Sequence, residues 1–495
     1  MRYPAALLLF VIAGGCVSPP PTNYPEIDLQ IPHVWQGAPV DSQGVALHWW
    51  TSFRSPELDA IIVEALDRNY DLQAAAARLE VAAAQARIAG ADLWPHINAG
   101  LDAARQRRNF IGFPFSEGGF DEEDGGSSPQ EEVFHTTFNS YGLSMNLSWE
   151  IDLWGRLRAG KQAALADYQA AEAQLNGAFL SLTAQTAKAW FATVESRAQI
   201  KLAQDTVESF GATAKLVADR VDAGVSPSLD SSLAESDLAE AQALLENRRV
   251  IHERLRRQLE ILLGHYPGAD RIVAGDLPAL PDPVPAGLPS ELLRRRHDIV
   301  VAERRLAATD ARVAQAQASL YPRLSLTSGA GTASEEFDDL LTSDFFVWTL
   351  AGNLTRPLFE GERLVAQVDV AQGRAKEAQA DYANTLLQAF AEVETALATE
   401  ELLAQKEQRL LRAVEQATQA STLSSDRYQQ GVQDLITVLE SQRRALVREI
   451  QLIAVRRERL DTRIDLHLAL GGGFDAQEYA HARAISTEPA RASSP

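Results

Sequence analysis

Histidines and carboxylates are the side chains of this chain that could bind metals or transfer protons. The 495 residues include nine histidines, and no two of them have metal-ligand spacing or accompany a nucleophile motif. His33, His48 and His96 fit surface or packing positions better than ligand positions. No glycine-rich phosphate-binding motif is present either. We therefore expect no enzymatic activity, no resident metal and no cofactor.

The single cysteine, Cys16, has a different chemistry. Residues 1–15 combine a positive start, a short apolar run and the small pair Gly14-Gly15, which is typical of a secretory signal peptide. A cysteine directly after such a pair resembles the bacterial lipobox, in which the thiol is lipidated after cleavage. A plain cleaved signal with an incidental cysteine is the alternative. We expect residues 16–54 to form a lipid-anchored tether, extended by the prolines at 19–21.

An acidic stretch at residues 116–132 is the densest group of carboxylates. It lacks the alternating ligand spacing of a calcium loop, so we expect a solvated loop. The whole chain has a formal net charge of −21, which disfavours binding to nucleic acid. The stretch contains Glu117, Asp121, Glu122, Glu123, Asp124, Glu131 and Glu132.

The chain contains an internal duplication. Leu93-Trp94-Pro95 reappears as Leu320-Tyr321-Pro322, and Arg220 to Val225 reappears as Arg427 to Val432. The first pair is displaced by 227 residues and the second by 207, so the copies keep their order but differ by insertions. Such self-similarity indicates one supersecondary unit used twice. Each copy is predicted to run helix, strand, strand, very long helix, turn, helix.

The predicted strands alternate apolar and polar residues. Strands of about 10 residues with aromatic ends favour a membrane barrel over a half-buried soluble sheet. Four strands cannot close a membrane barrel, because the smallest have about eight. Two chains would give a filled barrel, whereas three would leave an open lumen. The apolar positions are Tyr141, Leu143, Met145, Leu147, Trp149 and Ile151, and in the second copy Phe346, Trp348, Leu350 and Leu354.

The long helices are predicted to run from Gly155 to Gly224 and from Gly361 to Gly431. Each has roughly 65–70 residues and would be about 100 Å long, too long for one globular domain. Leucine or isoleucine recurs every seven residues on the last helix, which indicates coiled-coil packing. Single shorter helices over about 56–91 and 290–319 precede the strands. We thus expect repeats at 55–275 and 290–470, a proline-rich linker at 276–289 and a flexible tail at 471–495.

Three motifs connect the chain to a known family. They are Leu288 to Ile299 followed by Ala302-Glu303, Asp152 to Arg156, and Pro357 to Gly361. Together they resemble the signature of the TolC/OprM family, outer-membrane efflux lipoproteins of the NodT type. The resemblance covers about residues 45 to 470. It departs at His297, where the family usually has proline.

This resemblance implies a homotrimer with a 12-stranded β-barrel, continued by a periplasmic α-helical barrel. It implies that the inner end is closed by the turns at Asp219–Asp230 and Asp426–Glu440 and opens when an adaptor and an inner-membrane pump dock. Asp230 and Tyr428 fall where the family pairs an acid with a tyrosine. Glu440 falls at its acidic constriction and Ile436 at its apolar one. A solvated Glu440 and a merely packed Tyr428 are the alternative.

The sequence thus predicts a passive exit duct for small molecules in the outer membrane of a Gram-negative bacterium. Its expected partners are a periplasmic adaptor protein, an inner-membrane pump of the RND type and outer-membrane lipid. A conduit for type I protein secretion is the first alternative. The second is a coiled-coil envelope lipoprotein without a channel, which would leave the two matched strand pairs unexplained.

Overall fold

A computed structural model describes residues 35, 48–109, 135–285 and 289–472. Two compact units share these residues, and each unit takes part of its chain from both repeats. The sheet belongs to the unit that contains Ala84–Leu165 and Ala308–Ala375, and both return helices belong to the other. The predicted signal peptide, Cys16, the acidic stretch 116–132 and the tail beyond Gly472 lie outside the described residues.

The element order confirms the duplicated helix, strand, strand, long helix unit. Short 3₁₀ turns, η1 (Trp49–Phe53), η2 (Phe337–Leu341) and η3 (Ser343–Phe345), accompany the longer elements. The first repeat contains α2 (Pro56–Arg68), α3 (Tyr70–Ala91), β1 (His96–Asn109), β2 (His135–Ile151), α4 (Arg156–Asp222) and α5 (Ser228–Leu262). The second contains α6 (Pro289–Arg295), α7 (His297–Ala318), β3 (Arg323–Ser334), β4 (Phe346–Thr355), α8 (Arg363–Gln429) and α9 (Leu435–Ala469).

The helix boundaries repeat without drift. Both ends of α3 recur in α7 at the displacement of 227 residues seen in the sequence. Both ends of α4 and of α5 recur in α8 and α9 at the displacement of 207 residues. The change in displacement therefore falls between β1 and the start of α4, in the segment that contains the first strand pair and its connection.

Glycines mark the ends of the long helices, as the sequence predicts. Gly155 and Gly361 precede α4 and α8 with φ of 80° and 57°, and Gly224 and Gly431 follow them with φ of 75° and 76°. A residue in this left-handed region ends a helix at little cost only if it lacks a Cβ. Each long helix is 67 residues long and each return helix is 35.

The helix before each strand pair is broken, and the prediction of single helices over 56–91 and 290–319 is wrong. Ser55 accepts a hydrogen bond from the Leu58 N–H, as an N-cap should, but α2 stops at Arg68 because Asn69 adopts an extended ψ of 127°. In the second repeat Arg296 separates α6 from α7. Neither break contains a proline or a glycine that would explain it. Instead, a neighbouring segment of the chain approaches the backbone closely at each break.

The neighbouring segment at each break is the glycine turn that ends a return helix. A Cβ on Gly264 would lie 2.6 Å from the Arg68 carbonyl oxygen, and one on Gly471 would lie 2.8 Å from the Arg295 carbonyl carbon. Both glycines also have positive φ, 72° and 79°. Glycine is thus required twice over at these positions, for conformation and for close approach.

The main hydrophobic core surrounds α2. It joins α2 to aromatic residues of α4, to the end of α5 and to α9. Trp49, Trp50 and Phe53 are buried in this core, so the segment 16–54 does not act as a free tether to its end. Trp35 is buried in a second cluster that includes residues of α8 and α9. Gly471 and Gly472 are likewise buried, although the sequence predicts a flexible tail from 471.

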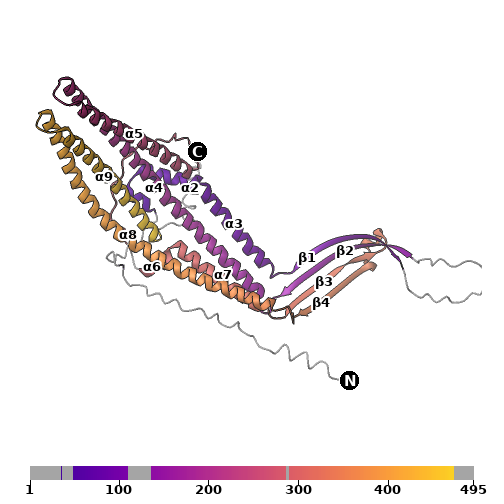
Figure 1. Cartoon of the computed structure of the whole chain (residues 1–495). Coiled ribbons are helices and arrows are strands. Elements are labelled where there is room, and N and C mark those ends of the chain that lie inside the picture. Colours follow the sequence, from indigo (N-terminus) through magenta and orange to yellow (C-terminus); the bar gives the residue numbers. More distant parts are fainter. Residues whose placement is uncertain (1–34, 36–47, 110–134, 286–288, 473–495) are drawn as a thin grey trace, which may run out of the picture. The chain divides into compact units, whose positions relative to one another are not determined.

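The four strands form one antiparallel sheet in the order β1-β2-β3-β4 (Figure 1). The register pairs Ile97 with Leu147, Leu147 with Ser328, and Ser328 with Leu350. Residues directly opposite in an antiparallel pair lie on the same face. The register therefore collects the predicted apolar positions on one face and Ser144, Asn146 and Ser148 on the other. Leu143, Met145, Trp348 and Leu350 are exposed in the single chain.

Candidate functional site

The turns that join α4 to α5 and α8 to α9 lie side by side at one end of the helical unit (Figure 1). Asp434 begins α9 by accepting a 2.7 Å hydrogen bond from the Thr437 N–H. This backbone hydrogen bond lowers the pKa of Asp434. Buried apolar residues from all four helices pack behind the turns: Ala214, Val217, Ala234, Leu435, Val438 and Leu439, together with Tyr428.

Tyr428 is held by the first repeat. The Arg220 guanidinium lies 4.9 Å from the centroid of its ring and donates a 3.2 Å hydrogen bond to its carbonyl oxygen. The ring is buried, and within the described residues its hydroxyl group has no hydrogen-bond partner. A buried hydroxyl without a partner costs about 1–3 kcal/mol, so the position favours any acceptor that a neighbouring surface could bring.

Asp230 lies in the first turn of α5 and is half-buried. It is one helical turn from Ala234, which packs in the same cluster as Tyr428. No hydrogen bond joins the Asp230 carboxylate to the Tyr428 hydroxyl within this chain. The predicted latch therefore has both members at the same turns, but it is not closed in this structure.

Ile436 and Glu440 lie one turn apart on α9 and point away from the helical core. Ile436 is 67% exposed, an unusual position for a large apolar side chain next to the buried Leu435. Glu440 forms a 2.7 Å ion pair with Arg444 on the same helix, and both side chains are at least half exposed. Exposed pairs of this kind contribute less than about 1 kcal/mol, so Glu440 remains available to solvent and to other charges.

A buried ion pair close to the turns escaped the sequence analysis. Asp237 of α5 is 3% exposed and pairs with Arg443 of α9. The hydrogen bond to Asp237 raises the pKa of Arg443 despite partial burial. The available signal was a carboxylate on the buried face of α5, between Ala234 and Ala241. A charge at such a position predicts a partner on the facing helix.

The family profile "Outer membrane efflux protein" matches residues 61–265 and 288–472, which is more than half of the chain. The chain belongs to the outer membrane efflux protein family. The two matched segments correspond to the two repeats and leave out most of the proline-rich linker.

Relatives of this efflux protein match over almost their whole length. Outer membrane protein OprJ of Pseudomonas aeruginosa is 32% identical, covering 96% of this chain and 97% of the relative. The pyoverdine export outer membrane protein OpmQ of Pseudomonas putida is 33% identical over 96% and 98%. The solved structure of the outer-membrane channel OprN is 28% identical, with a TM-score of 0.80 over 91% of this chain and 99% of that one. Members of the family are channel proteins, and this one belongs in the outer membrane, from which it extends into the periplasm.

Aromatic residues anchor the helix-proximal end of the efflux protein's sheet. The Trp149 indole N–H donates a 3.0 Å hydrogen bond to the Leu93 carbonyl, and the Trp154 indole N–H donates a 2.7 Å hydrogen bond to the Pro322 carbonyl. The Trp154 ring also stacks on Tyr321 at 5.1 Å. Indole rings with satisfied N–H groups are typical of the membrane–water interface. None of the helices in the described part of the chain contains an apolar stretch of the length that a membrane span requires.

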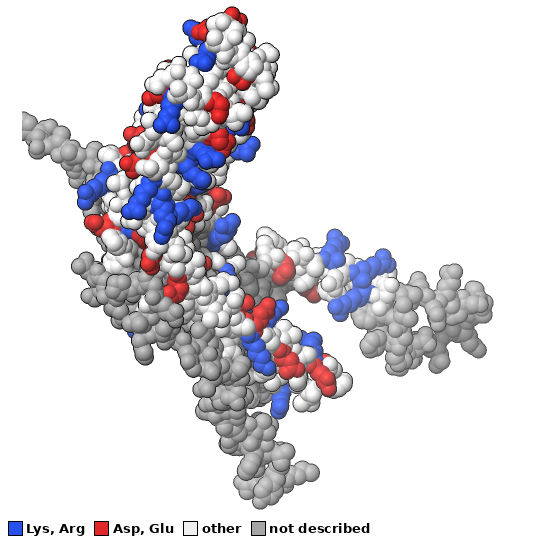
Figure 2. All heavy atoms as spheres, turned by 60° about the vertical axis from the view of Figure 1, so that its left-hand side comes forward, with Lys and Arg blue, Asp and Glu red and all other residues white. Residues whose placement is uncertain are grey.

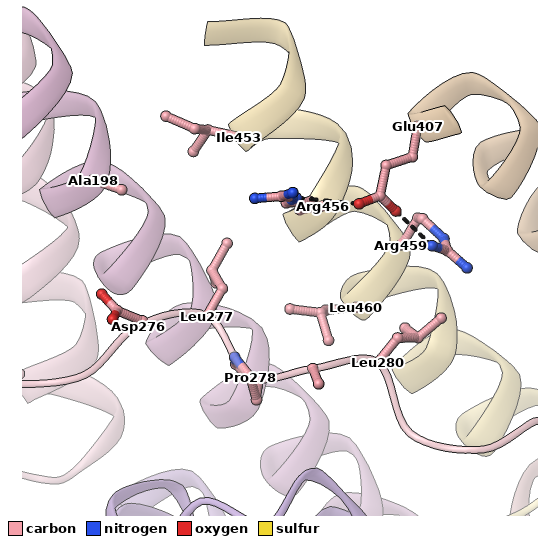
Figure 3. A pocket seen from close by; sticks show the side chains of 11 residues that line it. Ala198, Asp276, Leu277, Pro278, Leu280, Glu407, Ile453, Arg456, Arg459 and Leu460 are labelled. Carbon is pink, nitrogen blue, oxygen red and sulfur yellow. Dashed lines mark hydrogen bonds and ion pairs between the residues drawn. The ribbon is translucent and has the colours of Figure 1, made fainter. Parts of the chain in front are cut away.

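A cavity of about 520 Å³ lies between the proline-rich linker, α4, α8 and α9. Leu277 and Leu280 of the linker face it, and Arg456 and Arg459 of α9 both reach Glu407 of α8 (Figure 3). Because Glu407 pairs with both arginines, these three side chains tie α8 to α9. Among the described residues, no group of three or more histidines, cysteines and carboxylates could hold a metal ion.

The linker is also fixed by a buried arginine of α9. Arg463 is 1% exposed and donates hydrogen bonds to the carbonyls of Pro281 and Asp282, and it pairs with Glu400. Burial lowers the pKa of Arg463 to about 10. The residue therefore stays charged at neutral pH and holds the linker against the helices.

Proposed function

We propose that this efflux protein works as a homotrimer that forms a passive exit duct for small molecules. The observation that carries the proposal is the sheet, which has one apolar face and, within the described residues, no partner strand beyond β1 or β4. In a bilayer such edges cannot remain unpaired. Three copies would join β4 of one chain to β1 of the next and close a 12-stranded barrel with an open lumen.

The helix turns would form the gate of this duct. Three copies of exposed Glu440 around the threefold axis would make a carboxylate ring, which is a common cation filter. Three copies of exposed Ile436 would form an apolar constriction one turn away. The exposure of both side chains in the single chain supports this assignment, because neither is used in the core.

A latch between Asp230 and Tyr428 would hold the gate shut. Its support is the placement of both residues at the turns and the buried Tyr428 hydroxyl, which lacks a partner in the described residues. We assign the missing acceptor to Asp230, either of an adjoining chain in the closed trimer or after a small shift within one chain. Each closed latch adds a hydrogen bond to a charged group, which contributes about 1.5–3 kcal/mol.

The partners follow from the family. Curated relatives carry the names pyoverdine export protein and toluene efflux pump outer membrane protein, which describe small-molecule cargo. We infer that this chain docks with a periplasmic adaptor and an inner-membrane pump of the RND type and exports small molecules. Cys16 would carry the acyl chains that anchor each subunit in outer-membrane lipid.

Single-channel recording of the purified protein in planar bilayers tests this function. Asp230→Ala combined with Tyr428→Phe should increase the conductance, because the latch no longer holds the turns. Unchanged conductance would contradict the latch.

Glu440→Gln should weaken the block of the channel by multivalent cations. Glu246 is a control, since it is an exposed glutamate with a similar local arginine partner, and Glu246→Gln should not change the block. A wild-type protein without conductance would refute the duct itself.

A further inference from the structure

Two arginines lie on the apolar face of the sheet, at the end farthest from the helices. The register pairs Arg105 with Asn139 and Arg107 with Thr137. The preceding pairs on this face are Ala103 with Tyr141 and Leu101 with Leu143. The face therefore changes from apolar to basic within one residue pair.

The distances along the strand place these arginines at a definite level of the membrane. From Ile151 to Tyr141 the apolar face extends about 33 Å along β2. At the usual strand tilt this spans about 25 Å, the height of the apolar band of an outer-membrane barrel. Arg105 and Arg107 follow Ala103 by about 7 and 13 Å along β1. They therefore lie at the headgroup level, on the side of the membrane opposite to the helices.

The basic end is unusual in a chain with a net charge of −21. Figure 2 shows basic side chains gathered toward the far end of the sheet. Both arginines are exposed, and neither forms an ion pair with a described residue. Arg108 differs, because it lies on the polar face with its guanidinium 5.3 Å from the centroid of the Phe138 ring. An arginine is costly against acyl chains but favourable beside anionic headgroups, so a basic pair at this level fits an anionic ligand.

We propose that Arg105 and Arg107 bind the phosphate groups of the glycolipid in the outer leaflet, a lipid A headgroup. Guanidinium groups bind phosphate through two parallel hydrogen bonds, and neighbouring arginines on one strand face lie about 7 Å apart, within reach of one headgroup. Asn139 and Thr137, opposite on β2, supply further hydrogen-bonding groups to the same ligand. The inference rests on the proposed placement of the sheet in the outer membrane.

The test is a titration of the purified full-length protein with mixed micelles that contain diphosphoryl lipid A. The wild type should bind these micelles more tightly than micelles of phosphatidylcholine alone, and added salt should weaken the binding. Arg105→Gln with Arg107→Gln should reduce the affinity about 30-fold, by the usual contribution of a basic residue at an anionic membrane surface. Arg108→Gln, on the other face of the same strand, should change it less than about twofold.

Three results would overturn the proposal. One is equal affinity of the double variant and the wild type. Another is a wild type that does not prefer diphosphoryl lipid A to phosphatidylcholine. The third is a preference for diphosphoryl lipid A that appears only after the acidic residues of 116–132 have been replaced by neutral ones. In that case these carboxylates, and not lipid phosphates, would be the partners of the arginines in the wild type. Conductance measured on the same samples distinguishes failure of the lipid-binding proposal from failure of the proposed duct. The double variant should conduct like the wild type, because the arginines are not part of the conducting path.

Discussion

Asn69 in the first repeat and Arg296 in the second occupy the same break in the fold. The Asn69 amide donates a 3.0 Å hydrogen bond to the Leu262 carbonyl, while its oxygen caps α3 at the Leu72 N–H. Arg296 donates a 3.1 Å hydrogen bond to the Ala469 carbonyl. Leu262 and Ala469 are the last residues of α5 and α9. The duplication is thus preserved down to a single hydrogen bond, while the side chain that makes it has changed.

The change of side chain alters what the hydrogen bond depends on. Asn69 is neutral and needs no counter-ion. Burial disfavours the charged form of the Arg296 guanidinium by removing it from water. Asp298 and Glu392 pair with this guanidinium and raise its pKa above the usual value. The second repeat therefore needs three charged residues where the first uses one amide, and its stability should depend on those charges. Equivalent geometry does not imply equivalent energetics.

A second matched pair shows the same divergence. Arg256 and Arg463 both bind backbone carbonyls of the segment that follows α5, at Arg271 and at Pro281 respectively. One turn further along, the first repeat has Glu260 and the second has His467. Glu260 is buried, but the N–H groups of Arg271 and Ala269 lower its pKa. His467 is buried in a stack on Trp49, and burial lowers its pKa to about 4.

The sharpest test of shared geometry uses the glycines at the two breaks. Gly264→Ala and Gly471→Ala should each lower the free energy of unfolding by about 4 kcal/mol, which combines left-handed strain with a backbone clash. Gly224→Ala and Gly431→Ala are matched controls, since their φ is similar but a Cβ would meet nothing within 4 Å. They should cost about 1–2 kcal/mol. Denaturant unfolding in detergent measures the free energy of unfolding of all four variants. If the two pairs lose the same free energy, the close approach contributes nothing to the requirement for glycine.

The acid response should differ between repeats. His467 is neutral when folded but protonates below pH 6.5 when unfolded, so its contribution is complete above pH 6.5 and is lost as pH falls toward 4. The loss amounts to about 3 kcal/mol. Glu260, whose pKa is lowered, loses its contribution only below about pH 4.5. Unfolding of His467→Gln and wild type between pH 4 and 7 isolates the difference; a pH-independent gap between the two curves would contradict the assignment.

Arg296→Ala should destabilise the protein by about 2 kcal/mol. The hydrogen bond to Ala469 is lost, and the two carboxylates lose their cation, although both are partly exposed and can be hydrated. Added salt should weaken the wild type more than the variant, because only the wild type keeps the ion pairs. A wild type and a variant with the same salt dependence would show that the charges do not matter.

Asn69→Ala is expected to have the smallest effect, about 1 kcal/mol. It removes one cap and one neutral hydrogen bond, and its cost should not change with salt. Asn69→Ser, which retains a capping oxygen but does not reach Leu262, should recover about half of the loss. If the free energy of unfolding lost in Asn69→Ala depended on salt, the proposed difference between Asn69 and Arg296 would be wrong.

The long helices, the return helices and the strands could be predicted because local residues define them. Gly224 and Gly431 end helices by conformation alone, and alternation defines β2 by itself. The breaks at Asn69 and Arg296 could not be predicted, since those residues permit a helix and only contact with Gly264 and Gly471 ends it. At the turns, Tyr428 was identified, but its contact with Arg220 depends on how the two repeats pack. Ion pairs between helices, such as Asp237 with Arg443, have no fixed spacing in the sequence.

The fall in displacement from 227 to 207 residues between the copies is confined to the stretch from β1 to the start of α4. Later helices recover a constant displacement, so added length there does not propagate into the helical unit. Under the proposed placement of the sheet in the outer membrane, we expect an epitope tag inserted between Asn109 and His135 to leave the helical unit intact. Antibody labelling of the tag on intact cells would then test whether this end of the sheet faces the outside, while both long helices keep their native boundaries.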